Sequence, residues 1–544
     1  MTHRPDDQRL PGDRALAAHD AQRLRGDRSH RSLLDGLAGQ AEPIWLECAQ
    51  ALMLRKDPAA SAVVLGGALA EHPGSAELRL ALAGALLQNG DSVQAESLLR
   101  DVLAMAPDHA AATLLLARIL KEQGRMHAAA TVVRALFRHP RHDPELVIRA
   151  VELLDDCGRK EDAAALCEHE IAAGSTDPRL HAYAGMLLAQ LGQFELARTR
   201  HEFVLASSAQ ALDWHMPLGL ADLQRYHDIS HPDFARFHDY LQHAPLAWQA
   251  RSSLLFALGK AHDDIGDFAQ ASGYLREANA LVHANISWSG KLWRRSIEAR
   301  LGRRLPPGQL DAPTDWTPIF IVGAPRSGTT LLAELLGRNP QVCHRGEVAW
   351  LPTLAGQVLD AHGDYRGRLE RAASTYAAQV RQDDSAARWF IDKQPHNFMH
   401  VDLILAMFPN ARIIHCQRNA RDNALSLWMK SFQTGTQDFS YDFTDIGTVI
   451  RGSRRLMKHW TERFPASVLS VRYEQLASDP EGCLTNLSEW LQLPAHSLFG
   501  TQGSERPIST ASLWQARQPV HTRSVQRWRH YVPYVPELLQ LPED

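Results

Sequence analysis

Apolar and polar positions follow two different patterns in the two halves of this 544-residue chain. In the first half, helical stretches are separated by short turns that recur at a fixed distance. Four of these turns, "QNGDSVQA", "EQGRMHAA", "DCGRKEDA" and "QLGQFELA", repeat a glycine every 34 residues, with an alanine five residues after each glycine. The glycines are Gly90, Gly124, Gly158 and Gly192, and the alanines are Ala95, Ala129, Ala163 and Ala197. This period predicts stacked helix–turn–helix units that form a solenoid.

The two repeated residue types fit the same interpretation. Glycine suits a helix end, where a left-handed backbone closes the last turn, and alanine lets paired helices approach closely. A fifth copy, Gly266 with Ala271, follows a gap of about two degenerate repeats, and a weaker copy lies around Lys56. Over residues 40–285 the pattern resembles the tetratricopeptide repeat (TPR) family. The resemblance implies a concave surface that binds a peptide or partner protein; a scaffold or dimer interface without a ligand is the alternative.

In the second half, short apolar runs alternate with amphipathic helices. "PIFIVG", "ARIIHCQR" and "ASVLSVRYEQL" predict buried strands, and helices are expected from "GTTLLAELLGR", from "NALSLWMKSF" and around 481–491. This alternation predicts a parallel, doubly wound α/β sheet that binds ligands beyond the carboxyl ends of its strands. The predicted organisation is a mobile polar leader (1–40), a helical repeat domain (41–302), a Pro-rich linker (303–317) and an α/β domain (318–544).

The loop "IVGAPRSGTTLL" (321–332) carries the first candidate site. Gly323 and Gly328 have the spacing of a Walker A nucleotide loop, but Thr329 stands where that loop has its lysine. A strand–loop–helix unit directs backbone N–H groups and the positive helix end at an anion. Arg326 and the hydroxyls of Thr329 and Thr330 add donors. Because the lysine and a convincing magnesium-binding aspartate are missing, the loop predicts a phosphate-type ligand other than ATP; a mere packing loop is the alternative.

"PRSGTTLL" resembles the 5′-phosphosulfate loop of sulfotransferases that use 3′-phosphoadenosine 5′-phosphosulfate (PAPS), and it is especially similar to the tyrosylprotein and bacterial TPR-fused sulfotransferases. The resemblance covers approximately 317–535 and implies a P-loop-like sulfotransferase fold. "QRNARDNALS" matches a second family element, in which an arginine at a strand end and a serine eight residues later bind the 3′-phosphate. "VRYEQLASDP" matches a segment whose tyrosine contacts the nucleotide. The implied donor-binding residues are Arg326, Ser327, Gly328, Thr329, Thr330, Arg418, Ser426 and Tyr473.

The same resemblance implies catalytic residues. Glu347 in "RGEVAW" corresponds to the family's catalytic glutamate, although the family has two adjacent acids and valine follows Glu347 here. Lys393 in "IDKQPHN" corresponds to the catalytic lysine, and Arg326 would share in charge stabilisation. His396 is the alternative base, because other sulfotransferases use histidine. Taken alone, these side chains would read as an exposed cap and a solvated strand end.

A basic segment near the C-terminus adds further candidates for the 3′-phosphate. In many sulfotransferases a late basic segment closes over this group. Arg517 and Arg523 are the equivalents that the resemblance suggests, with Ser512 as a weaker one. A solvated basic surface is the alternative for each arginine.

Composition narrows the remaining choices. Net charge is −4, which gives no reason to expect a nucleic-acid binder, and no apolar run approaches the length of a membrane span. Six scattered cysteines without a C-x-x-C pair indicate reduced thiols and a cytoplasmic setting. We therefore expect a cytoplasmic, metal-independent PAPS sulfotransferase whose acceptor is a peptide tyrosine or else a carbohydrate, lipid or metabolite hydroxyl. A TPR adaptor with a dead nucleotide domain and a kinase with a variant loop are the competing interpretations; oligomeric state stays open.

Overall fold

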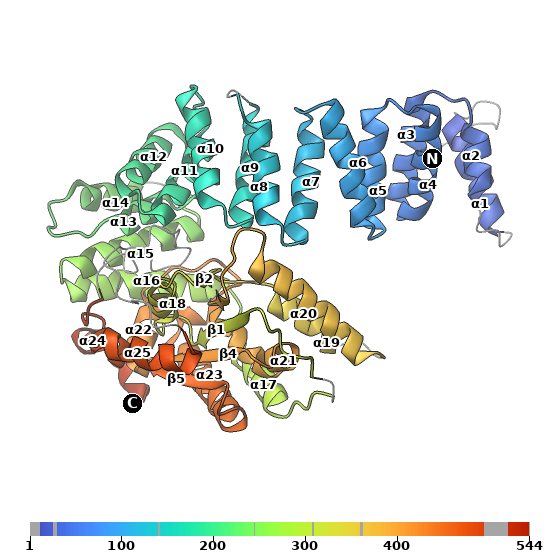
Figure 1. The fold of residues 1–544 in the computed structure, drawn as a ribbon. Helices are drawn as coiled ribbons and strands as arrows, with labels where there is room; N and C mark the ends of the chain where they lie inside the picture. Colours follow the sequence, from blue (N-terminus) through green and yellow to red (C-terminus); the bar gives the residue numbers. More distant parts are fainter. Residues whose placement is uncertain are drawn as a thin grey trace. The chain divides into compact units, whose positions relative to one another are not determined.

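The structure is a computed structural model that describes residues 11–24, 30–139, 142–243, 245–306, 309–359, 363–493 and 520–542. The chain divides into two compact units, Met1–Arg159 and Lys160–Asp544. In its described residues the first unit contains helices and no strand, whereas the second begins with helices and continues into a sheet (Figure 1).

The first unit is a row of helices in which each packs on its neighbours in sequence. Its helices are α1 (Pro11–Leu24), α2 (Arg31–Leu37), α3 (Glu42–Leu54), α4 (Pro58–Glu71), α5 (Ala76–Gln88), α6 (Ser92–Met105), α7 (Ala110–Glu122), α8 (Met126–Leu136) and α9 (Pro144–Asp156). Helices α1 and α2 lie within residues 1–40, the predicted leader, which stays a prediction. Leu33 and Leu37, one helical turn apart, are fully buried in an apolar cluster with Trp45. These two leucines give the short helix α2 an apolar side, although the surrounding sequence is polar.

The repeat pattern has the predicted structural cause. The glycines end α5, α7, α9, α11 and α15 with φ values of 85°, 78°, 70°, 81° and 82°, for Gly90, Gly124, Gly158, Gly192 and Gly266 in turn. The five paired alanines, at positions 95, 129, 163, 197 and 271, are all 0% exposed. Lys56, the weak copy, has the same left-handed conformation with φ 60°. The helical TPR-like architecture is therefore confirmed, and it extends from the first unit into the second.

The second unit begins with eight helices in its described residues. These are α10 (Lys160–Ala172), α11 (Pro178–Leu191), α12 (Phe194–Ser207), α13 (Met216–Asp222), α14 (Pro232–His243), α15 (Trp248–Asp264), α16 (Phe268–Asn285) and α17 (Gly290–Leu301). The degenerate region between Gly192 and Gly266 contains α12 to α15, and its short helix α13 explains why the repeat spacing is lost there.

A parallel sheet of five strands follows, in the order β2-β3-β1-β4-β5. The strands are β1 (Thr317–Gly323), β2 (Val342–His344), β3 (Trp389–Asp392), β4 (Arg412–Gln417) and β5 (Val468–Arg472). Helices between and after them are α18 (Thr329–Leu336), α19 (Leu351–Leu359), α20 (Tyr365–Arg381), α21 (Val401–Met407), α22 (Ala420–Trp428), α23 (Phe443–Arg463), α24 (Tyr473–Ser478), α25 (Pro480–Leu491) and α27 (Trp528–Tyr531). The predicted parallel α/β domain is confirmed.

Both faces of the sheet are buried, which explains the continuous apolar run of β1. Ile319 and Ile321 face a cluster built by α18, α24 and α25. Phe320 and Val322, the alternate residues, face a cluster built by α19, α20, α21 and α23. Because β1 pairs with β3 and β4 in parallel, the carboxyl ends of these three strands lie at the same edge of the sheet.

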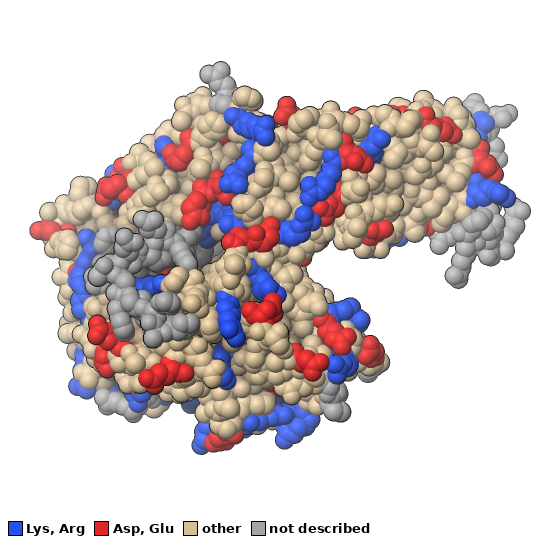
Figure 2. Space-filling view, viewed as in Figure 1, with Lys and Arg blue, Asp and Glu red and all other residues tan. Residues whose placement is uncertain are grey.

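Charge is distributed without a dominant sign on the face drawn in Figure 2, where Lys and Arg are interspersed with Asp and Glu. None of the described helices is both long enough and apolar enough to cross a membrane.

Candidate functional site

The glycine-rich loop joins β1 to α18 at the carboxyl edge of the sheet. Its backbone is left-handed at Arg326 and Gly328, with φ values of 70° and 100°. A Cβ atom on Gly323 would lie 2.5 Å from the Cys416 carbonyl oxygen, so glycine permits the close approach of the loop to β4. A positive φ is uncommon at an arginine, and surrounding contacts must hold the residue in this conformation.

The two elements expected to bind different phosphates contact each other directly. Arg326 Nε donates a hydrogen bond of 3.1 Å to Ser426 Oγ on α22. Arg418 follows β4, and its Nη1 donates to the Arg326 carbonyl oxygen at 3.0 Å. Asn423 Nδ2, also on α22, donates to the Pro325 carbonyl oxygen at 2.8 Å. The loop, Arg418 after β4, and helix α22 thus form a single polar site.

Tyr473 lies between these elements, as the first residue of α24. A Cβ atom on Gly328 would lie 2.6 Å from Tyr473 Cδ2, so the ring packs on the loop. The Arg418 guanidinium carbon lies 4.6 Å from the centroid of the same ring, a cation–π geometry. Thr329 and Thr330 open α18 beside Gly328, with Thr329 buried and Thr330 partly buried.

The electrostatics of this site favour an anion. Burial, together with the nearby positive charge of Arg418, lowers the pKa of Arg326 to about 10. Burial also lowers the pKa of Arg418. Two half-buried guanidinium groups that repel each other would be stabilised by a negative charge placed between them. Among the described residues, Ser327 Oγ and Arg418 Nε are buried without a hydrogen-bond partner, so the site retains donors for such a ligand.

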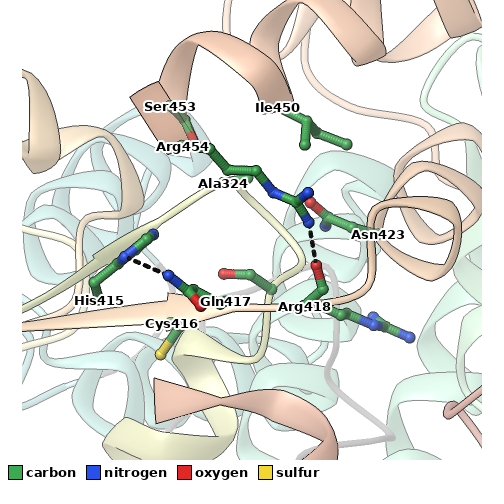
Figure 3. A pocket seen from close by; sticks show the side chains of 10 residues that line it. Ala324, His415, Cys416, Gln417, Arg418, Asn423, Ile450, Ser453 and Arg454 are labelled. Carbon is green, nitrogen blue, oxygen red and sulfur yellow. Dashed lines mark hydrogen bonds between the residues drawn. The ribbon is translucent and has the colours of Figure 1, made fainter. Parts of the chain in front are cut away.

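A small cavity lies between the ends of β1 and β4 and helix α23 (Figure 3). Its lining includes Ser327 and Arg418, and Arg454 of α23 donates to the Arg418 carbonyl oxygen at 3.0 Å. His415 lines the same cavity; burial, followed by the charge of Arg454, lowers its pKa to about 3. The imidazole is therefore neutral at physiological pH and leaves the arginines as the cationic groups of this cavity lining.

Glu347 and Lys393 form an ion pair at the same sheet edge. Lys393 N donates to the Gly346 carbonyl oxygen at 2.8 Å, which extends the β2–β3 pairing beyond both strands. Lys393 Nζ lies 2.5 Å from Glu347 Oε1. The lysine side chain is 1% exposed and the glutamate 40%, so a solvent-facing carboxylate meets a buried cation.

Asp392 organises the backbone around this pair, although the sequence analysis did not select it. Its Oδ1 accepts from the backbone N–H groups of Val348 and Gln394 at 3.2 and 2.9 Å. Its Oδ2 accepts from Tyr376 OH at 2.5 Å and from Asn397 Nδ2 at 2.8 Å. Burial raises the pKa of Asp392 to about 6, against the lowering effect of these hydrogen bonds. One buried carboxylate therefore fixes the residues that follow Glu347 and Lys393.

His396, the alternative base, lies near Glu347 on the turn after Lys393. Its Nε2 lies 3.1 Å from Gln437 Oε1; with the Gln437 amide in this orientation Nε2 is the donor, which leaves Nδ1 as the basic nitrogen. Burial lowers the pKa of His396, while Gln437 and the charge of Glu347 oppose that shift. The lowered pKa keeps the ring neutral at physiological pH and makes it a weaker base than an ordinary histidine.

The predicted C-terminal residues are only partly described. Arg523 is exposed and precedes Ser524, whose carbonyl oxygen accepts from Arg418 Nη2 at 2.8 Å. Arg517 and Ser512 lie outside the described residues. The segment 520–542 therefore reaches the Arg418 element, as the basic-segment hypothesis requires, but that hypothesis stays a prediction for the individual arginines.

Comparison with known proteins gives family matches in both halves of the chain. The sulfotransferase family model matches residues 318–497, and the tetratricopeptide repeat model matches 52–119 and 86–147. An uncharacterised protein of Aquifex aeolicus is 32% identical over 54% of this chain and 42% of its own length. Protein-tyrosine sulfotransferase 1 of Danio rerio is 26% identical over 40% of this chain and 66% of its own length. Nodulation protein NoeE of Sinorhizobium fredii is 33% identical over 39% of this chain and 59% of its own length.

The chain thus spans 42% to 66% of the length of these three relatives. Among solved structures, the sulfotransferase domain of the Synechococcus PCC 7002 olefin synthase matches 42% of this chain and 91% of its own length, with 19% identity and a TM-score of 0.32. The two family matches show that the chain carries tetratricopeptide repeats in its N-terminal part and a sulfotransferase-family domain in its C-terminal part.

Proposed function

We propose that this chain is a PAPS-dependent sulfotransferase that moves the sulfuryl group from PAPS to an acceptor hydroxyl. The observation that carries the proposal is the direct contact between two cationic elements, made by Arg326 with Ser426 at 3.1 Å and by Arg418 with the Arg326 carbonyl at 3.0 Å. PAPS has two separate anionic groups, at its 5′ and 3′ positions, that such a double site would suit. ATP has no 3′-phosphate.

The residues present fit this donor. Backbone and side-chain donors from Arg326 to Thr330 would hold the phosphosulfate at the start of α18, where the helix dipole favours negative charge. Arg418 and Ser426 would hold the 3′-phosphate, for which the planar guanidinium is suited because it can pair bidentately with phosphate oxygens. Ser327 Oγ and Arg418 Nε, which have no hydrogen-bond partner within the described part of the chain, are consistent with an anionic ligand at this place.

The donor supplies a sulfuryl group whose bond to the bridging phosphate oxygen breaks as the acceptor oxygen bonds to sulfur. Glu347 would take the acceptor proton, and Lys393 and Arg326 would stabilise the charge left on the departing phosphate oxygen. A phenol has a pKa near 10, so proton removal by a carboxylate should accompany sulfur–oxygen bond formation. His396 Nδ1 is the alternative base. Positioning and charge stabilisation should dominate, as in phosphoryl transfer.

For the acceptor we propose a peptide tyrosine recruited by the repeats. The names of several relatives, among them the Danio rerio protein, support a tyrosine acceptor, and tetratricopeptide stacks commonly bind peptides or proteins. A carbohydrate, lipid or metabolite hydroxyl is the alternative. All six cysteines are free thiols, which supports a reducing, cytoplasmic setting.

Calorimetry on the full-length protein tests the donor proposal. We expect 3′,5′-ADP to bind at least about 100-fold more tightly than 5′-AMP, since one phosphate paired with charged donors contributes about 3 kcal/mol. Equal affinity for the two nucleotides, or magnesium-dependent turnover of ATP, would contradict the proposal and favour a kinase with a variant loop.

A further inference from the structure

Helix α22, which carries Ser426, rests on the last repeat helices. Phe256 of α15 and Leu275 of α16 are buried in the same apolar cluster as Leu425 and Trp428 of α22. The buried Asn279 Nδ2 of α16 also donates to the Trp428 carbonyl oxygen at 2.9 Å. The family models match 52–147 and 318–497, so these supporting helices lie outside both. The repeat helices thus form part of the foundation of the proposed nucleotide site.

The C-terminal segment 520–542 joins the same two regions. On the nucleotide side, the Ser524 carbonyl accepts from Arg418 Nη2 at 2.8 Å. Asp422 of α22 accepts from the backbone N–H groups of Gln526 and Trp528 at 2.7 and 2.9 Å. These contacts fix the segment immediately beside the Arg418 guanidinium.

On the repeat side, Asp263 of α15 binds the same segment. It forms an ion pair with Arg527 and accepts from Tyr531 OH at 2.5 Å, and its side chain is 7% exposed. Burial acts to lower the pKa of Arg527, but the charge of Asp263, the hydrogen bond to it and the neighbouring Tyr531 and Asp264 together raise that pKa above its ordinary value. Burial and the same carboxylate raise the pKa of Tyr531 well above its ordinary value, so its hydroxyl stays protonated as a donor. Arg527 is three residues after Ser524, so Asp263 binds the same short segment whose carbonyl oxygen accepts from Arg418.

We propose that Asp263 is a positioning residue for the nucleotide site, contributed by the repeat helices and acting on Arg418 through Arg527, Tyr531 and the Ser524 carbonyl. This inference rests on the proposed function, because it concerns the group expected to bind the 3′-phosphate. Arg418 is held between the carbonyl oxygens of Arg326 and Ser524. Loss of the second acceptor leaves the orientation of the guanidinium restrained only by the Arg326 carbonyl and the Tyr473 ring, and a bidentate phosphate contact is sensitive to that orientation.

The test uses full-length Asp263→Asn and Tyr531→Phe. Tyr226→Phe is the matched control, because Tyr226 OH donates to the buried Asp233 at 2.9 Å within the repeat helices. Asp263→Asn should raise the Kd for 3′,5′-ADP about tenfold, the effect of losing one hydrogen bond to a charged group, and Tyr531→Phe should raise it by a smaller factor. In both of these variants the affinity for 5′-AMP should change by less than about twofold. The control Tyr226→Phe should leave the affinities for both nucleotides unchanged. It should lower the thermal midpoint by about as much as Tyr531→Phe does.

Kinetics separate positioning from general damage. Asp263→Asn should raise the KM for PAPS about tenfold with kcat at saturating donor close to wild type, because the reacting groups remain in place. Hydrogen exchange in 520–542 should become faster in this variant. An unchanged Kd in Asp263→Asn, or an equal rise in Tyr226→Phe, would overturn the positioning role. Failure of the wild-type protein to bind 3′,5′-ADP would instead contradict the proposed function itself, so the two failures are distinguishable.

Discussion

Replacing Arg418 by alanine should weaken binding of 3′,5′-ADP much more than binding of 5′-AMP. In the structure the guanidinium donates to two carbonyl oxygens, at 3.0 and 2.8 Å, and its Nε has no partner among the described residues. Hydrogen bonds to charged groups contribute about 1.5–3 kcal/mol each. Loss of a bidentate contact to the 3′-phosphate should therefore cost about 3 kcal/mol, or roughly 100-fold in Kd.

Calorimetry with both nucleotides isolates the contribution of the 3′-phosphate. The comparison forms a cycle in which one change is Arg418→Ala and the other is removal of the 3′-phosphate, so general damage to the site cancels. Arg412→Ala is the matched control, because Arg412 begins the same strand and also donates to a carbonyl oxygen, that of Ala466 at 3.1 Å. It should change neither affinity. Equal weakening of both nucleotides by Arg418→Ala, or no weakening, would refute the 3′-phosphate assignment.

Three further outcomes are expected. Glu347→Ala should abolish sulfuryl transfer in a PAPS turnover assay while 3′,5′-ADP affinity changes less than about twofold; joint loss of both would remove Glu347 from the catalytic role. Gly328→Ala should weaken 3′,5′-ADP binding at least about tenfold in calorimetry. The added Cβ would lie 2.6 Å from Tyr473 Cδ2, and the φ of 100° at position 328 disfavours alanine. Unchanged affinity would contradict the packing of Tyr473 on the loop. Because the pKa of Asp392 is raised to about 6 in the folded protein, the unfolded chain loses this proton first as pH rises, and the free energy of unfolding should fall by about 3 kcal/mol between about pH 4 and 6. The thermal midpoint of Asp392→Asn should lack this part of the wild-type pH dependence, and identical pH profiles would contradict it.

Local backbone chemistry explains why much of the fold was predictable. The repeat glycines occupy left-handed positions that disfavour other residues, and the repeat alanines lie where helices touch. Similarly, the alternating burial of Ile319 and Phe320 in β1 leaves a continuous apolar run in the sequence. Each of these signals lies within a few residues of the feature that it predicts.

Long-range contacts explain what the sequence did not reveal. Glu347 and Lys393 were selected separately, but their ion pair depends on the β2–β3 pairing, and β2, with its three residues, is too short to leave a pattern. Asp392 gains its role from Val348, Tyr376 and Asn397, which only the fold brings together. Asp263 and Arg527 are 264 residues apart and carry no local motif.

The most direct test of the central claim is incubation of the purified protein and PAPS with cell lysate, followed by mass spectrometry of proteins and metabolites. The account predicts a new sulfuryl adduct that depends on PAPS, disappears with Glu347→Ala and falls on peptide tyrosine. An adduct on a metabolite or carbohydrate would contradict the proposed acceptor alone. No PAPS-dependent adduct, in a protein shown by calorimetry to bind 3′,5′-ADP, would contradict the catalytic account and favour a non-catalytic nucleotide-binding adaptor.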